Sequence, residues 1–124
     1  MTNQFLPLAT VQPAIRDALV AYARADAIED FYKGRQIKAI VGNPAGGDYD
    51  NWMRLFTRHW ARFIPGRPSF IVQNMPGAGQ IIASNYLANT ADRDGSVIGF
   101  TERALPYLRL MGDQNIRFDP RNFN

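Results

Sequence analysis

The sequence contains no cysteine and a single histidine, His59. The lack of cysteine excludes disulfides, thiolate nucleophiles and cysteine-based zinc sites. One histidine supports neither a histidine-rich metal site nor a Ser-His-Asp triad within the chain. No apolar run approaches the roughly 18 residues of a membrane-spanning helix, so direct membrane insertion is not expected. These absences direct attention from covalent and metal chemistry to non-covalent binding.

The composition is that of one small globular domain. The 124 residues are 46% hydrophobic and 20% charged, which excludes a fully disordered chain. A chain of this length buries roughly two-thirds of its unfolded surface, enough for one core but not for two domains. The net charge of +3 suits a small anionic ligand and is weak evidence for nucleic acid.

Residues 1–30 are predicted to form a separate N-terminal segment. An amphipathic helix is expected over about residues 11–24, with four residues roughly aligned on one face: Val11, Ile15, Leu19 and Tyr22. The alternative is a secretory signal, because Ala-x-Ala patterns occur at residues 21–23 and 23–25. The segment lacks the basic start and clean apolar core of such a signal.

Residues 31–124 read as repeated strand–loop–helix units. The expected strands are 36–41, 69–73 and 96–100, and the expected helices are 49–63, 79–90 and 102–111. Short connections between such elements imply right-handed βαβ units and a parallel sheet, an α/β fold. Ligands of open parallel sheets bind outside the carboxyl ends of the strands. Residues 42–50, 74–80 and 100–102 are therefore expected at one sheet edge.

Two glycine-rich loops in this set suggest an anion site. Gly46 and Gly47 in the first loop, and Gly77 and Gly79 in the second, let the main chain approach a ligand closely. The N–H groups and dipole of a following helix attract a carboxylate or phosphate. The alternative is that these glycines only form tight turns.

Other motifs are weaker. The first loop lacks the Gly-Lys-Ser/Thr ending of a P-loop. Gly77 and Gly79 begin a dinucleotide fingerprint, but Ile82 stands at its third glycine and no acidic residue follows at the required distance. A phosphate- or dinucleotide-binding enzyme domain is thus kept as an alternative. Asp48 and Asp50 are interpreted as helix-capping residues rather than as an acid/base pair.

The helix at 49–63 carries two stripes. Trp52, Phe56 and Trp60 are expected in the core. The basic stripe of Arg54, Arg58 and Arg62 is expected to be a solvated face, with a nucleic-acid-binding module as an alternative.

The order of several motifs resembles a known family. These are residues 31–34 (Phe-Tyr-Lys-Gly), residues 40–50 (Ile-Val-Gly-x-Pro-Ala-Gly-Gly-x-Tyr-Asp), residues 72–79 (Val-Gln-Asn-Met-Pro-Gly-Ala-Gly) and residues 94–99 (Asp-Gly-x-Val-Ile-Gly). Together they are similar to the extracytoplasmic substrate-binding proteins of tripartite tricarboxylate transporters, the TctC or Bug family. Asp48 and Gln80 stand where that family commonly has glycine.

The resemblance implies part of the first domain of a periplasmic, two-lobed (type II, Venus-flytrap) receptor without catalysis or cofactor. Such a receptor binds a small carboxylate and delivers it to a membrane permease. The ligand-binding residues implied are Asn43, Pro44, Ala45, Gly46, Gly47, Asp48, Asp50, Pro76, Gly77, Ala78, Gly79, Gln80 and Thr101. Family members are more than twice this length, so the second lobe is expected to be missing and the affinity of this chain to be low. A truncated gene product without function is the remaining alternative.

Overall fold

Three parallel strands form the centre of the fold in the order β2-β1-β3. β1 spans Gln36–Val41, β2 spans Ser69–Asn74 and β3 spans Val97–Phe100. The computed structural model describes residues 12–122. β1 pairs along its whole length with β2, from Gln36 opposite Ser69 to Val41 opposite Asn74. The predicted α/β fold with a parallel sheet is confirmed.

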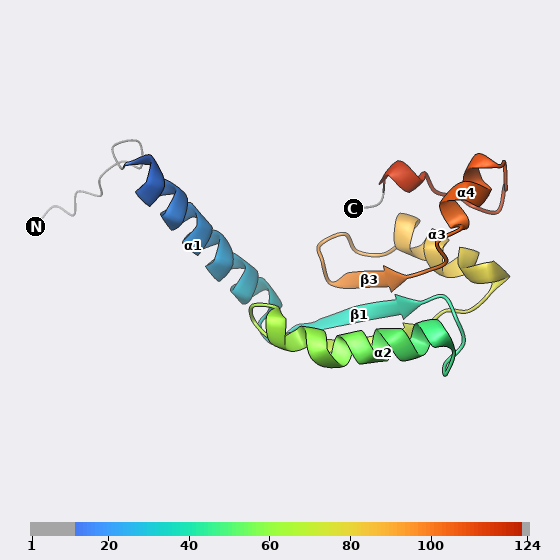
Figure 1. Cartoon of the computed structure of the whole chain (residues 1–124), viewed down its shortest axis with the longest axis horizontal. Coiled ribbons are helices and arrows are strands. Elements are labelled where there is room, and N and C mark those ends of the chain that lie inside the picture. The colour runs from blue at the N-terminus through green and yellow to red at the C-terminus, as the bar shows by residue number, and fades with distance from the viewer. Residues whose placement is uncertain (1–11, 123–124) are drawn as a thin grey trace, which may run out of the picture.

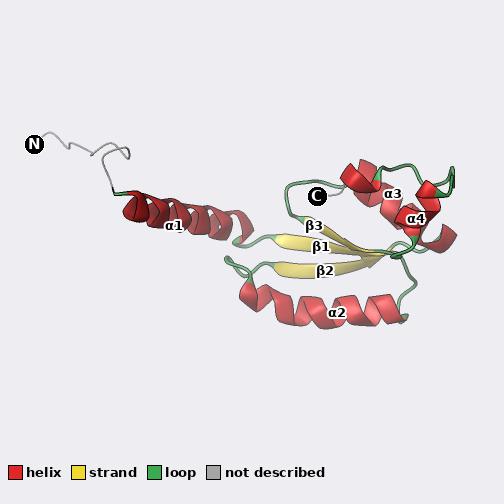
Figure 2. Ribbon diagram, turned by 45° about the horizontal axis from the view of Figure 1, so that its top comes forward, coloured by secondary structure: helices red, strands yellow, loops and turns green. Residues whose placement is uncertain are grey.

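Helices cover both faces of the sheet, as Figures 1 and 2 show. α2 (Asp48–Trp60) lies on one face, and α3 (Ile81–Asn89) and α4 (Leu105–Leu110) lie on the other. The α2 face buries Ala39 and Val41 of β1 against Met53. Flanking side chains from β2 and β3, among them Phe70 and Phe100, pack around them. Ala39 and Val41 share this face because side chains two residues apart in a strand point to the same side of the sheet.

A second apolar cluster holds the C-terminal segment against α3. Leu105 of α4 packs with Ile116 and Phe118, and Ile81 of α3 borders them. Asn85 of α3 pairs with the same segment: its amide donates to the Asn115 carbonyl at 2.9 Å and accepts the Arg117 N–H at 2.8 Å. These two hydrogen bonds of the Asn85 side chain therefore hold the C-terminal segment against α3.

α1 (Pro13–Tyr32) projects from the sheet as a single helix (Figures 1 and 2). It buries no residue, so the predicted apolar face does not pack; Val11 lies outside the described residues. The helix also continues eight residues past the predicted end at 24. Only its C-terminal end touches the rest of the fold, where the Tyr32 hydroxyl donates to the Gly95 carbonyl at 3.2 Å.

The expectation that Trp52, Phe56 and Trp60 lie in the core is wrong. Their exposed fractions are 54%, 48% and 47%. The three rings follow one another along α2, and the last stacks on Phe70 at the β2 edge, with 6.4 Å between centroids. The three-stranded sheet is too narrow to cover them, and Met53 and Thr57 are buried instead. Among residues 12–122, no helix combines the length and apolar character needed to cross a membrane.

Candidate functional site

Three connections meet in one hollow at the edge where the strands end. Its volume is about 300 Å³. It is lined by Gly42, Asn43 and Pro44 after β1, by Pro76, Gly77, Gly79 and Gln80 after β2, and by Glu102 after β3. We call these eight residues the loop hollow. The predicted convergence of the loops at one sheet edge is confirmed as geometry.

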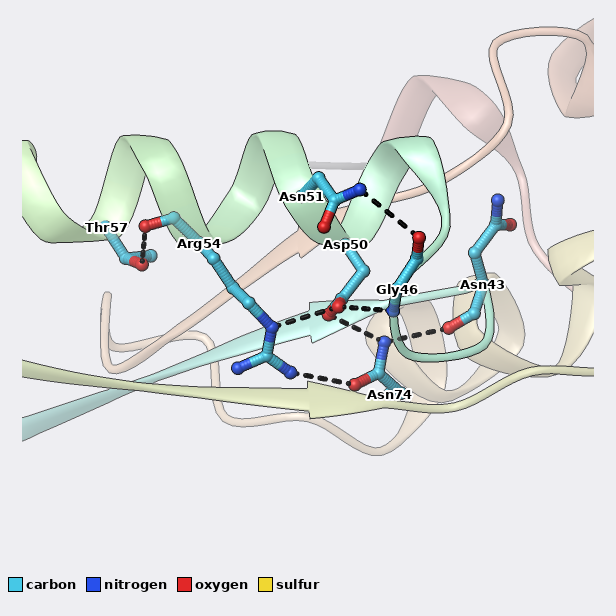
Figure 3. Close-up of polar contacts among 7 residues, drawn as sticks. All are labelled: Asn43, Gly46, Asp50, Asn51, Arg54, Thr57 and Asn74. Carbon is cyan, nitrogen blue, oxygen red and sulfur yellow. Dashed lines mark hydrogen bonds and ion pairs between the residues drawn. The ribbon is translucent and has the colours of Figure 1, made fainter.

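A buried carboxylate fixes the shape of the first loop. Asp50, in the first turn of α2, is 2% exposed, and its Oδ2 accepts the Gly46 N–H at 2.8 Å. The same oxygen accepts Arg54 Nε at 2.9 Å, and Oδ1 accepts Asn74 Nδ2 at 2.9 Å. Figure 3 shows how these side chains come together from α2, the first loop and the end of β2. One carboxylate therefore ties three segments together.

The second amide contact of Asn74 extends this network to the loop hollow. Asn74 Nδ2 also donates to the Asn43 carbonyl at 2.9 Å, and its Oδ1 accepts Arg54 Nη2 at 3.3 Å. Capping of α2 by a side chain at the N-cap position does not occur, because Gly47 holds that position. Asp50, the third residue of α2, instead accepts the N–H of Gly46, the residue before the N-cap, much as the acidic residue of a capping box accepts a backbone N–H at the start of a helix.

The electrostatics of Asp50 follow from its donors. Hydrogen bonds from the Arg54 guanidinium and the Gly46 N–H lower the pKa of the Asp50 carboxyl from 3.8 to about 2, although burial opposes this. A carboxylate with charged and backbone donors favours its ionised form. Asp50 is thus a fixed anion at neutral pH, which makes it a structural group rather than a proton-transfer group.

The stability of the chain is expected to fall in acid partly through Asp50. Because its folded pKa of about 2 lies below 3.8, the contribution is complete above about pH 4 and is lost as the pH falls toward 2. Urea unfolding at several pH values, followed by circular dichroism, measures this. In Asp50→Asn the pH dependence over that window should be shallower than in the wild type. Equal slopes in the two proteins would contradict the assignment.

The second loop has an unusual backbone. Gly77, Ala78, Gly79 and Gln80 all have positive φ angles, +139°, +46°, +59° and +71°. Glycine adopts such angles readily, whereas alanine and glutamine do so at a cost. Gly77 and Gly79 therefore permit the turn, and the side chain of Gln80 at the end of the turn is buried.

Gln80 lies buried against the first loop. Its exposed fraction is 7%, and its Oε1 has no hydrogen-bond partner among the described residues. A Cβ built on Gly42 would come within 2.6 Å of Gln80 Cβ and 2.7 Å of Gln80 Oε1. Gly42 thus makes room for the glutamine, and the two loops meet through this contact.

Glu102 closes the hollow from the third strand. Its Oε2 accepts the Tyr49 hydroxyl at 3.1 Å, and its Oε1 accepts the Ala104 N–H at 3.3 Å. Burial and the hydrogen bond to Glu102 raise the pKa of Tyr49, so the phenol stays a donor at neutral pH. The carboxylate is therefore held in place from two sides.

The structure distributes the predicted site residues over several places. Asn43, Pro44, Pro76, Gly77, Gly79 and Gln80 line the loop hollow. Ala45, Asp48 and Ala78 are exposed outside its lining, and Asp50 is buried behind the first loop. Thr101 instead lines a separate hollow with α3 residues such as Leu87.

The main-chain donors expected at Gly46 and Gly47 are already used within the loop. Gly46 donates to Asp50, and Gly47 donates to the Pro44 carbonyl at 3.3 Å.

The arginines of the basic stripe make different contacts. Arg54 pairs with Asp50, while the Arg62 guanidinium lies over the Phe63 ring at 4.8 Å.

Gly42, Asn74 and Glu102 lie within the ranges expected at this sheet edge, but they are not among the ligand-binding residues that the resemblance implies. Gly42 and Asn74 each stand at the end of a predicted strand, where parallel sheets carry their sites, and that signal was available. Glu102 follows Thr101 by one residue, and only the path of the chain after β3 decides which of them enters the hollow. Within residues 12–122, no group of acidic or histidine side chains is arranged to hold a metal ion.

Comparison with known proteins gives one informative relative. The UPF0065 protein in the gbd 5′ region of Cupriavidus necator is 30% identical over 118 residues, 95% of this chain. The chain spans 35% of the length of that relative. No protein-family profile and no solved structure matches the chain. The α/β architecture is consistent with part of a periplasmic-binding-protein-like domain.

Proposed function

We propose that this chain is part of a solute receptor of the TctC or Bug type that binds a small carboxylate. UPF0065 denotes that family, and the relative matches nearly the whole chain. The observation that carries the proposal is the loop hollow itself: the two loops that the sequence resemblance assigns to ligand binding form its walls. A binding role without catalysis agrees with Asp50 being committed to structural contacts.

In the proposed mechanism the ligand carboxylate lies at the glycine-rich second loop, before α3. At Gly79 no atom lies within 4 Å of the place where a Cβ would stand, so a ligand oxygen reaches the backbone there, whereas at Gly77 the Ile82 side chain fills that space. The positive end of the α3 dipole stabilises the anion. Gly46 and Gly47 support the first wall rather than donating to the ligand. Residues 31–124 supply one side of a cleft, and a second lobe supplies the other. The receptor is periplasmic and releases its ligand unchanged to a membrane permease.

Titration of the ¹⁵N-labelled chain with carboxylates tests this function. Citrate, succinate and acetate are added at constant ionic strength, with succinamide as the neutral control. We expect amide shift changes at Gly42, Gly77, Gly79 and Gln80, saturating in the millimolar range because half of a two-lobed site buries little of the ligand. Shifts caused equally by succinamide, or by NAD and inorganic phosphate in preference to carboxylates, would contradict the proposal.

A further inference from the structure

The outer side of β3 is an open strand edge. β3 stands last in the sheet order β2-β1-β3, so among residues 12–122 no strand pairs with that side. The Ser96 carbonyl points to β1, where it accepts the Lys38 N–H at 2.9 Å. Because alternate residues of a strand direct their backbone groups to opposite sides, the N–H and C=O groups of Val97 and Gly99 point to the open side. Such an edge is a template for pairing with a further strand.

The sheet face that carries α2 is left uncovered beside β3. α2 packs mainly on β1 and β2, and a hollow of about 220 Å³ remains next to β3. Its lining contains no charged side chain and consists of Met53, Phe56, Trp60, Ile98, Gly99 and Phe100. We call these six residues the apolar shelf. The Trp52 ring, 6.1 Å from that of Phe56, extends the shelf along α2, and both rings remain about half exposed.

A second hollow, of about 550 Å³, lies beside β3 on the face that carries α3. Leu87, Ala88 and Ala91 contribute to its lining, with one acidic and one basic side chain, Asp92 and Arg93. Side chains of a strand point alternately to the two faces of a sheet. A strand paired with β3 would therefore place its side chains in the two hollows in turn.

The other edge of the sheet, along β2, is protected by charge. Arg54 and Arg58 line a hollow there together with residues 70–72 of β2. Charged side chains at a sheet edge oppose pairing with further strands. β3 and its two neighbours, Ser96 and Thr101, are uncharged. The edge of β3 is thus the one suited to pairing.

We infer that β3 is the interface of a homodimer, in which it pairs antiparallel with β3 of a second copy about a two-fold axis at Gly99. This register sets Val97 opposite Thr101 of the second copy, so that backbone groups pointing outward meet one another. Ile98 then lies opposite Phe100 of the second copy, on the shared apolar shelf. The association closes at two copies, because the arginine-lined β2 edges form both ends of the joined sheet. The inference is independent of the proposed function, since the loop hollow lies at the ends of the strands.

The area and the charge at this edge suit a second copy. An aromatic side chain buries about 150–250 Å² when fully covered, so each half-exposed ring of Trp52, Phe56 and Trp60 has about 100 Å² left to bury. The rings of two copies supply about 600 Å², half of the roughly 1,200 Å² of a stable interface, and the strand edges and hollows add the rest. Asp92 and Arg93 balance each other, so net charge at the edge does not oppose the approach of two copies.

Sedimentation velocity of the whole chain tests the association. Between about 1 μM and 1 mM we expect a change from monomer to a species of twice that mass, with a dissociation constant of about 10 μM. A chain that stays monomeric at 1 mM would overturn the inference and leave the edge to a strand of another polypeptide. Open-ended growth into large oligomers would overturn it as well, because the two-fold pairing closes.

A charge placed on the apolar shelf tests the location of the interface. Phe56→Lys should raise the dissociation constant at least about thirtyfold, because an ammonium group would be buried at the centre of the contact. Tyr107→Lys is the matched control: it replaces an exposed aromatic residue of α4, on the other face of the sheet, and should keep the wild-type value. Equal dissociation constants in the two variants would overturn the assignment.

Amide hydrogen exchange tests the strand pairing without any substitution. NMR follows exchange of the wild-type chain at concentrations below and above the dissociation constant. The amides of Val97 and Gly99 should exchange about fivefold more slowly at the higher concentration, because they become paired in the dimer. Those of Ile98 and Phe100 face β1 and should be protected at both. Exchange at Val97 and Gly99 that is independent of concentration would overturn the pairing, even in a chain that dimerises.

Discussion

Replacement of Asp50 by alanine is expected to lower the free energy of unfolding by about 3 kcal/mol. The carboxylate is buried and accepts hydrogen bonds from Gly46, Arg54 and Asn74. Without it the Gly46 N–H and the Asn74 amide lose a partner at once. Because the Arg54 side chain is 46% exposed, water replaces much of its share, which keeps the loss well below that of a fully buried ion pair. Urea unfolding at neutral pH, followed by circular dichroism, gives the value.

Two further variants show where the Asp50 effect comes from. Asp48 lies with Asp50 in the first turn of α2 but is exposed. Asp48→Ala should therefore change the free energy of unfolding by less than about 0.5 kcal/mol. Arg54→Ala should cost about 1 kcal/mol, because the other two donors to Asp50 remain. If Asp50→Ala were no more harmful than Asp48→Ala, the network would not be a determinant of stability.

Replacement of Gly42 by alanine is expected to cost about 2 kcal/mol, and Gln80→Gly is expected to restore most of it. The added Cβ would meet Gln80 Cβ at 2.6 Å, an atom near the backbone that cannot swing aside. Gly42 does not have a positive φ, so alanine meets no backbone strain of its own. Once Gln80 is glycine, the colliding atoms are gone. The two loops should therefore be coupled through this pair.

A double-mutant cycle on residues 42 and 80 measures the coupling. The free energies of unfolding of both single variants, the double variant and the wild type give an interaction term of about 1–2 kcal/mol if the contact is as described. Gly112→Ala, with positive φ but no atom within 4 Å of its added Cβ, serves as a control whose cost Gln80→Gly should leave unchanged. Simple additivity at residues 42 and 80 would refute the contact.

The sequence predicted the sheet well because its strands are short β-branched runs bounded by glycine and proline. β1 was placed at its observed bounds, and the ends of β2 and β3 were each within one residue. From parallel strands, the meeting of the loops follows without knowledge of side chains. That part of the candidate site was therefore predictable.

The remaining features depend on tertiary contacts that a periodic pattern does not contain. Trp52, Phe56 and Trp60 have the spacing of a buried stripe, but burial depends on whether a sheet is wide enough to cover it. Gly46 and Gly47 have the freedom to donate to a ligand, yet Asp50 and Pro44 take their N–H groups first. The burial of Gln80 depends on its packing against Gly42, a contact between two loops that the sequence does not show.

The amide of Asn74 has a consequence for how the strands align. It stands opposite Val41 at the last pair of β1 and β2, and its Nδ2 contacts both the Asn43 carbonyl and the Asp50 carboxylate. A slip of one residue between these strands would turn this side chain to the other face of the sheet and remove both contacts. The contacts that hold the first loop therefore require the observed alignment of β1 with β2. A misaligned sheet would lack not only its packing but also the first wall of the hollow.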